Sequence, residues 1–260
     1  MTARDNWWAG PVVSTLLIMG GTADARALAA AVLARRPKMR VITSLAGRTA
    51  VPRKPMGEVT VGGFGGAQGL ADYMLQENVD GVIDATHPFA AAISANVAEA
   101  SRMTGVPRLV LMRASWTFAD DAGVVRVADT AAAARALDKG DRRVFLAIGR
   151  KEVSAFTDMP GRFHLLRFID APDVPPPFAD CHVLTGRPGG LEAEERILDE
   201  FRIDALVAKN GGSDASRAKI DAALDRGIKV VLIDPPPAPP LPHGDSIDAA
   251  LEWLAGLSPS

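Results

Sequence analysis

Short apolar runs alternate with alanine-rich amphipathic segments through the first half of the chain. The runs contain few polar residues, which is typical of strands covered on both faces, and the segments between them imply parallel crossovers. The pattern predicts strands near residues 16–20, 40–44, 58–61, 81–85 and 108–112. It predicts helices near residues 23–35, 67–77 and 89–104. Pro88 stands where the last of these helices would begin.

The same alternation restarts in the second half. It predicts strands near residues 143–148, 163–169, 182–185, 205–208 and 229–233, and helices near 130–137, 191–201, 215–225 and 246–257. The pattern lapses across residues 114–130, where a domain boundary is expected. We therefore expect an α/β fold with two Rossmann-like parallel-sheet domains that face each other across a cleft. Residues 1–14 would form an N-terminal extension, residues 15–115 the first domain and residues 116–260 the second.

The composition narrows the class of protein. The 260 residues carry a formal net charge of -2, so we expect no nucleic-acid partner. No apolar run approaches the ~20 residues needed to cross a bilayer, and residues 1–14 make a poor signal peptide, so we expect no membrane partner. The single cysteine, Cys181, excludes an intrachain disulfide and favours a reducing compartment. No His or Cys set has metal-ligand spacing. These features predict a soluble cytoplasmic protein without a metal site.

The loop after the first predicted strand has the chemistry of a phosphate site. Gly20 and Gly21 permit a tight turn, and Thr22 stands where it would cap the following helix and bond a phosphate oxygen. A tight turn without a ligand is an equally good interpretation of these three residues alone. The second strand ends at Ser44 with no carboxylate, and Arg48 follows, which favours a 2′-phosphate over a free ribose hydroxyl. A dinucleotide bound here would therefore be NADP(H), unless Arg48 is an ordinary surface arginine.

Two further loops end strands of the first half. Four glycines, Gly63 among them, surround Phe64 and would allow close approach to a flat ligand or form a mobile flap. Thr86 and His87 follow the fourth strand, at the edge where parallel sheets bind ligands. His87 is suited to relay a proton, although a histidine that caps a helix is the commoner case.

Basic and polar groups follow several other predicted strands. Because such groups recur at strand ends, they indicate an anionic substrate with several carboxylates or phosphates, although any single one suits a solvated loop. The residues are Arg113, Arg150, Arg187, Lys209, Asn210 and Ser213.

Six motifs in fixed order point to a known family. They are GGTADAR (residues 20–26), SLAGRT (44–49), GGFGGAQGL (62–70), DATHPFA (84–90), VFLAIGR (144–150) and KN (209–210). Each is modest alone, but the ordered series is specific. Along residues 16–237 the chain resembles the precorrin-6A reductase family of cobalamin biosynthesis.

The resemblance implies NADPH-dependent reduction of one double bond in a polycarboxylate tetrapyrrole, converting precorrin-6A to precorrin-6B. It maps Thr22, Ser44 and Arg48 onto the family's cofactor positions, and Gly20, Gly21, Gly63 and Thr86 are further candidates for the cofactor. His87 and Lys209 are our candidates near the reacting atoms, and the substrate candidates are Arg113, Arg150, Arg187, Asn210 and Ser213.

Two alternatives stay open. The cobalt-containing ring of the anaerobic pathway is one substrate alternative, since one sequence does not distinguish a metallated ring from a metal-free ring. A non-catalytic module that binds NADPH or a tetrapyrrole is the other, because the second half departs from the family's usual motifs. Where the family usually reads Lys-Asn-Ser-Gly-Gly, this chain has Gly211 after Asn210 and Ser213 two positions later.

Overall fold

The chain forms two compact units in the computed structural model, which describes residues 14–47, 54–119, 123–237 and 242–257. Unit 1 runs to Ala114 and resumes at Pro237, whereas unit 2 runs from Ser115 to Pro236. The first crossing lies one residue before the boundary expected from the sequence. The C-terminal segment differs from the expectation, because it returns to unit 1 instead of completing the second domain.

Unit 1 is built on a sheet that has six strands within the described residues, all parallel, in the spatial order β12-β5-β4-β1-β2-β3. The strands are β1 (Thr15–Met19), β2 (Arg40–Leu45), β3 (Glu58–Val61), β4 (Gly81–Asp84), β5 (Arg108–Leu111) and β12 (His243–Gly244). All five residues of β1 are buried, as expected for a central strand covered on both faces.

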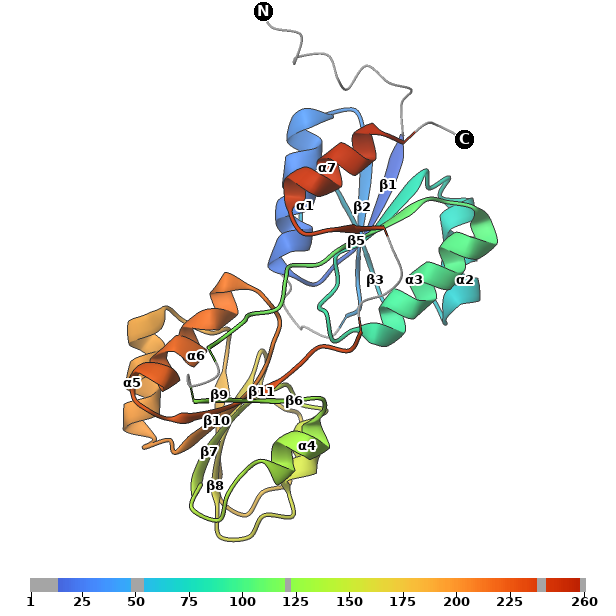
Figure 1. Cartoon of the computed structure of the whole chain (residues 1–260). Coiled ribbons are helices and arrows are strands. Elements are labelled where there is room, and N and C mark those ends of the chain that lie inside the picture. The colour runs from blue at the N-terminus through green and yellow to red at the C-terminus, as the bar shows by residue number, and fades with distance from the viewer. Residues whose placement is uncertain (1–13, 48–53, 120–122, 238–241, 258–260) are drawn as a thin grey trace, which may run out of the picture. The chain divides into compact units, whose positions relative to one another are not determined.

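Helices cover both faces of this sheet (Figure 1). They are α1 (Ala23–Arg35), α2 (Ala67–Gln76), α3 (Ala91–Thr104) and α7 (Ile247–Ala255). The α1 and α7 helices pack on one face, where Leu28 and Leu251 join Ile18 in one apolar cluster. The α2 and α3 helices pack on the other face around Leu17 and Met74. Burial of the apolar side of α7 explains why the C-terminal segment belongs to unit 1.

Unit 2 repeats this plan. Its sheet has six parallel strands in the described range, in the order β6-β11-β10-β7-β8-β9. The strands are β6 (Val124–Val127), β7 (Arg143–Ala147), β8 (Phe163–Phe168), β9 (Cys181–Thr185), β10 (Ala205–Lys209) and β11 (Lys229–Ile233). The helices are α4 (Thr130–Arg135), α5 (Leu191–Glu200) and α6 (Asp214–Asp225), with a 3₁₀ turn η1 at Val153–Phe156. Phe145 and Leu206 anchor the core beneath α5 and α6.

Five strands of each sheet, β1–β5 in unit 1 and β7–β11 in unit 2, have the same topology, whereas the sixth strand follows them in sequence in unit 1 (β12) and precedes them in unit 2 (β6). In each, the first strand of the repeat lies in the centre, the next two follow on one side, and the fourth and fifth follow on the other. The strand order therefore reverses between β1 and β4 in unit 1 and between β7 and β10 in unit 2. Ligands of open parallel sheets bind beyond the carboxyl ends of the strands at such a switch point. The two Rossmann-like parallel sheets predicted from the sequence are confirmed.

Three elements were not predicted, and one helix begins later than expected. The β6 strand lies at a sheet edge and leaves Val125 and Arg126 exposed, so it lacks a continuous apolar run. The β12 strand has only two residues, and η1 is a single turn. The α3 helix begins at Ala91 because the Ala90 N–H donates to the His87 carbonyl in a turn that contains Pro88.

Candidate functional site

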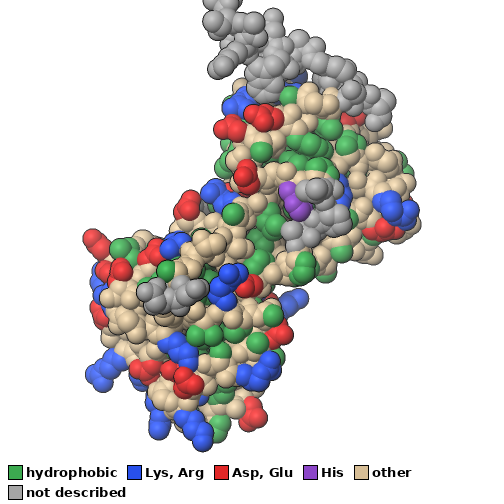
Figure 2. Space-filling view, viewed as in Figure 1, with side chains coloured by type: hydrophobic (Ala, Val, Ile, Leu, Met, Phe, Trp, Pro, Cys, Tyr) green, Lys and Arg blue, Asp and Glu red, His purple; other side chains and the backbone are tan. Residues whose placement is uncertain are grey.

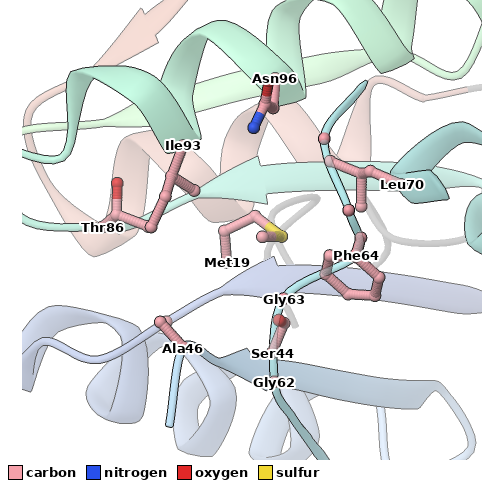
Figure 3. Close-up of a pocket in the computed structure, with 13 residues that line it drawn as sticks. Met19, Ser44, Ala46, Gly62, Gly63, Phe64, Leu70, Thr86, Ile93 and Asn96 are labelled. Carbon is pink, nitrogen blue, oxygen red and sulfur yellow. The ribbon is translucent and has the colours of Figure 1, made fainter. Parts of the chain in front are cut away.

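The carboxyl edge of the unit 1 sheet holds a cavity of ≈ 140 Å³. Met19, Phe64 and Ile93 give it apolar walls, and Figure 3 shows Met19 between Ile93 and the loop that carries Phe64. Asn96 of α3 extends its amide toward the same space (Figure 3). Among the described residues, no carboxylate lines this cavity. A neutral, largely apolar cavity with one amide suits a flat ring system.

Four predicted cofactor residues line this cavity: Gly20, Ser44, Gly63 and Thr86. Ser44 is buried near the end of β2. Its carbonyl accepts a 2.8 Å hydrogen bond from the Gly20 N–H. A Cβ at Gly20 would lie 2.7 Å from Thr43 Cγ2, so only glycine lets the first loop approach β2 this closely. The fold thus brings the first two predicted cofactor loops together.

The backbone of the turn after β1 is open to a ligand. The hydroxyl of Thr22, at the end of that turn, is already hydrogen-bonded. Gly21 has φ +105°, and nothing lies within 4 Å of a Cβ built there. The Thr22 hydroxyl accepts from the Ala25 N–H at 3.0 Å and donates to the Ala85 carbonyl at 2.7 Å. Thr22 therefore caps α1 and joins the loops after β1 and β4. A phosphate here would meet backbone N–H groups at the start of α1, not the Thr22 hydroxyl.

The glycine loop after β3 is anchored by its phenylalanine. The ring of Phe64 lies 4.8 Å from that of Tyr73, centroid to centroid. A Cβ at Gly69 would lie 1.8 Å from the Phe64 carbonyl oxygen, so α2 and the loop fit together only because residue 69 is glycine. Gly65 and Gly66 have φ +78° and +105°. These contacts favour the interpretation of close approach to a ligand over that of a mobile flap.

A buried acid at the end of β4 orients Thr86 in the following loop. Asp84 is 2% exposed, and its Oδ1 accepts from both the N–H and the hydroxyl of Thr86, at 3.1 and 2.7 Å. Asp84 Oδ2 is buried with no hydrogen-bond partner among the described residues. His87 is exposed, and its Nδ1 accepts from the Phe89 N–H at 3.3 Å. The Thr86 hydroxyl donates its hydrogen to Asp84, so its oxygen can serve a ligand only as an acceptor.

Arg113 lies beside the start of α1 in unit 1. Its Nη2 is 2.7 Å from Asp24 Oδ1, and its Nε donates to Asp24 Oδ2 at 3.0 Å. Asp24 stands in the first turn of α1, where its charge would repel a bound phosphate. The bidentate Arg113 offsets that charge. Arg26, which the sequence analysis did not single out, adds a second cation by donating to the Thr22 carbonyl at 3.1 Å.

An ion pair joins the segment after β7 to the end of β10 at the switch point of unit 2. Lys209 Nζ at the end of β10 lies 2.7 Å from Glu152 Oε1 in the segment after β7. Arg150, in the same segment, is half-exposed and reaches Asp173 at 3.4 Å and the Ala171 carbonyl at 3.1 Å. Figure 2 shows Lys and Arg side chains beside Asp and Glu side chains over the visible face of unit 2. Two of the predicted basic residues of unit 2, Arg150 and Lys209, are therefore paired with acids.

Asn210 differs from its predicted role as a substrate contact. It is fully buried; its Oδ1 accepts from the Trp116 N–H at 2.8 Å, and its Nδ2 donates to the Trp116 carbonyl at 3.1 Å and to Asp234 Oδ1 at 3.2 Å. Trp116 follows the first crossing between the units, and Asp234 precedes the second. Asn210 thus fixes both crossing segments to the end of β10, which uses its whole amide.

Arg187 and Ser213 follow β9 and β10. Arg187 is exposed and forms no ion pair with any described residue. Ser213 is the N-cap of α6, but its side chain makes no capping hydrogen bond. Exposed Ile169, Val174 and Leu191 lie in the loops after β8 and β9 or at the start of α5. The carboxyl edge of unit 2 thus combines cations with apolar side chains.

Comparison with known proteins decides the family. The family described as "Precorrin-6x reductase CbiJ/CobK" matches residues 15–255. The precorrin-6A reductase of Rhodococcus erythropolis is 43% identical over 247 residues, 95% of this chain and 99% of that protein. That of Mycobacterium tuberculosis strain H37Rv is 42% identical over 94% of this chain and 99% of its own. A solved structure titled "CobK precorrin-6A reductase" superposes with a TM-score of 0.87 at 37% identity, covering 95% of this chain and 98% of that one. The chain belongs to the precorrin-6x reductase family.

Membership in the precorrin-6x reductase family confirms the resemblance and makes the chain a reductase of cobalamin biosynthesis. Arg48, assigned to the cofactor from the sequence, lies outside the described residues. No helix in the described ranges is long and apolar enough to span a membrane. Within those ranges, no three or more His, Cys, Asp or Glu side chains are grouped so that they could hold a metal ion.

Sequence reasoning missed several residues of the site. Asn96 lines the cavity from α3, Asp24 and Arg26 stand at the start of α1, and Glu152 pairs with Lys209. Arg26 lies inside the GGTADAR motif and so had a signal. Asn96 is one polar residue in a helix whose register against the cavity depends on where α3 begins, so it had no comparable signal.

Proposed function

We propose that this chain catalyses the NADPH-dependent reduction of a ring double bond of precorrin-6A, giving precorrin-6B, in the cytoplasm. The observation that carries the proposal is the carboxylate-free cavity beside the open glycine turn of unit 1, in a chain of this family. When bound, NADPH supplies the hydride. The chain supplies binding, orientation and a proton.

The start of α1 suits the pyrophosphate of a dinucleotide. Backbone N–H groups in the first turn of a helix lack intrahelical partners and attract phosphate oxygens. Gly21 leaves space for close approach, Arg113 offsets the charge of Asp24, and Arg26 adds positive charge. The end of β2 carries Ser44 and no carboxylate, and a carboxylate there would repel a 2′-phosphate. Arg48 is our candidate partner for that phosphate.

The cavity suits the adenosine half of the cofactor. Met19 and Phe64 offer apolar surface to a flat base, and Asn96 offers both a hydrogen-bond donor and an acceptor to its edge. Thr86 faces the cavity with its hydroxyl hydrogen committed to Asp84, so it serves as an acceptor. Gly63 contributes backbone without a side chain in the way.

The carboxyl edge of unit 2 suits a tetrapyrrole. Arg150, Arg187 and Lys209 follow three different strands of one sheet, and Ser213 adds a hydroxyl. Guanidinium and ammonium groups bind carboxylates, and the exposed Ile169 and Leu191 offer apolar contact to a flat ring. We propose Lys209 as the proton donor, since Glu152 holds its ammonium at the switch point. His87 is the alternative donor.

The decisive experiment is anaerobic incubation of the purified chain with precorrin-6A and NADPH, following nicotinamide and ring absorbance together. Matched loss of NADPH and conversion of the ring are expected. Conversion of only the cobalt-containing ring would reassign the substrate, although the names of the two relatives above do not include cobalt. Binding of both ligands with neither ring converted would show a non-catalytic module. Equal rates with NADH would overturn the preference for NADPH.

A further inference from the structure

Unit 2 buries a cluster of three charged side chains that the proposed chemistry does not use. The side chains of Arg167 and Glu194 are 8% and 1% exposed, and Arg167 Nη1 lies 2.6 Å from Glu194 Oε2. Lys219 is 5% exposed, and its Nζ donates to the Ser216 carbonyl at 2.7 Å. Burial lowers the pKa of Lys219 to about 8, against the opposing charge of Glu194. Three charges withdrawn from water require a physical reason.

Stability does not provide that reason. A buried ion pair regains only part of the free energy lost when both ions leave water, and apolar residues of similar size often replace such a pair without loss. Arg167 lies near the carboxyl end of β8, and Glu194 lies in the first turn of α5, so the pair stands beneath the edge that we assign to the substrate. Its position there points to a role in arranging that edge.

The second oxygen of Glu194 reaches the loop that leads into α5. Glu194 Oε1 accepts from the backbone N–H of Gly189 at 2.8 Å. A Cβ at Gly189 would lie 2.8 Å from the Cβ of Ala193, so the loop rests directly on the first turn of the helix. Both oxygens of the buried carboxylate are therefore used, one for Arg167 and one for the loop.

The same loop carries an exposed cation. Arg187 stands two residues before Gly189, and the loop leaves β9 through Gly186, whose φ of +116° favours glycine. Arg187 forms no ion pair within the described residues, in contrast to Lys209, which is held by Glu152. The position of the Arg187 guanidinium thus depends on the backbone beneath it, and Glu194 fixes that backbone.

We propose that Glu194 is a positioning residue: through the Gly189 N–H it holds the loop of residues 186–190 in the conformation in which Arg187 meets a substrate carboxylate. The inference rests on the proposed function, because it takes the tetrapyrrole as the ligand of unit 2. Arg167 holds the Glu194 carboxylate in place. Glu194 itself does not touch the substrate.

Two double variants isolate the contact with Gly189. Arg167→Met combined with Glu194→Met removes the pair and leaves the loop without its acceptor. Arg167→Met combined with Glu194→Gln also removes the pair but retains a carbonyl oxygen for the Gly189 N–H. We expect the Met/Met variant to raise KM for precorrin-6A roughly tenfold, as for the loss of one charge-assisted contact, with kcat and KM for NADPH unchanged. The Met/Gln variant should stay within about threefold of the parent.

Two further measurements identify the cause. Hydrogen exchange should show faster exchange of the loop of residues 186–190 in the Met/Met variant than in the Met/Gln variant. Arg187→Ala should raise KM for precorrin-6A in the parent and add nothing in the Met/Met variant, because coupled residues are not additive. Glu192→Gln, in the same helical turn but exposed, serves as the control and should change neither quantity.

The outcomes separate the two hypotheses. A parent protein that does not turn over precorrin-6A overturns the proposed function and this inference with it. An active parent with equal KM values for the two double variants overturns the inference alone. Additive effects of Arg187→Ala and the Met/Met variant would also overturn it, since Glu194 would then act through something other than the Arg187 loop.

Discussion

The two units share one strand order, yet different chemistry joins the loops at their switch points. In unit 1 the Thr22 hydroxyl donates to the Ala85 carbonyl at 2.7 Å, a neutral hydrogen bond. In unit 2 Lys209 and Glu152 form an ion pair at 2.7 Å. The same backbone plan therefore joins its loops through a neutral hydrogen bond in unit 1 and through an ion pair in unit 2.

This difference follows from where each ligand's charge would meet the protein. A pyrophosphate is a compact anion that the N–H groups at one helix start can meet, so unit 1 needs few cations and offsets the single acid at that place, Asp24, with Arg113. Carboxylates around a macrocycle are spread over many ångströms, so a ligand of that kind needs cations on several loops. Unit 2 has them after β7, β9 and β10. Fold alone does not specify the ligand; the loops do.

The variant Lys209→Met tests the ion pair at the switch point of unit 2 and should have the largest effect. We expect kcat for precorrin-6A to fall about 100-fold or more, the low end of what a positioned acid contributes, with KM for NADPH unchanged. The fold should survive because Glu152 is left with about a third of its side chain exposed to water. Glu152→Gln, which keeps an acceptor for Lys209, should cost less than tenfold. Turnover that survives Lys209→Met but is lost in His87→Ala would transfer the proton donor to unit 1.

A second test asks whether Arg113 serves the cofactor or the substrate. Arg113→Met leaves Asp24 unpaired beside the proposed phosphate site, so KM for NADPH should rise about tenfold, the effect of one uncompensated charge. Adding Asp24→Asn removes the repulsion and should restore most of the affinity. KM for precorrin-6A should stay constant in both variants. A rise in that KM, without rescue by Asp24→Asn, would return Arg113 to the substrate side as the sequence predicted.

The repeating apolar pattern predicted most of the fold. Central strands such as β1 and β7 are covered on both faces, and their sequences are therefore apolar runs. Edge elements escaped it. The β6 strand exposes its two central residues at a sheet edge, and β12 is too short to have a pattern. The position of α7 in unit 1 also escaped, because an amphipathic helix does not specify which sheet it will cover.

The candidate site divides in the same way. Residues whose role lies in the backbone, such as Gly20 and Gly63, were found because glycine at a strand end carries its own signal. Roles that depend on a distant partner were not foreseen. Asn210 was assigned to the substrate but binds Trp116, which lies 94 positions earlier in the chain. Nothing in the sequence around Glu194 indicated its contacts with Arg167 and Gly189.

Acid sensitivity should also distinguish the units. Burial lowers the pKa of His164 in β8 below its ordinary value, and its Nε2 has no partner among the described residues. A lowered pKa means that the folded state holds the proton less tightly than the unfolded state. The contribution of neutral His164 to the free energy of unfolding is therefore complete above pH 6.5 and is lost as the pH falls below that value. We expect unit 2 to lose unfolding free energy between pH 7 and pH 5, by at most about 2 kcal/mol.

His164→Leu should flatten that dependence without loss of stability at pH 7. Denaturant unfolding at a series of pH values, with hydrogen exchange reporting each unit separately, measures it. His182→Gln on the neighbouring β9 is the matched control, because that ring is exposed and should leave the slope as it is. Equal acid sensitivity of the two units in the parent would contradict the assignment.

The smallest expected effect tests whether the proposed cofactor site of unit 1 functions without a buried charge. Asp84→Asn keeps the oxygen that accepts both hydrogen bonds from Thr86 and replaces the unpartnered Oδ2 with an amide. KM for NADPH should change by less than roughly threefold, because only the charge is removed. Asp84→Ala, which removes both bonds, should raise it more. A large loss in the asparagine variant would show that the cofactor site of unit 1 depends on a buried negative charge, and the contrast with unit 2 would no longer hold.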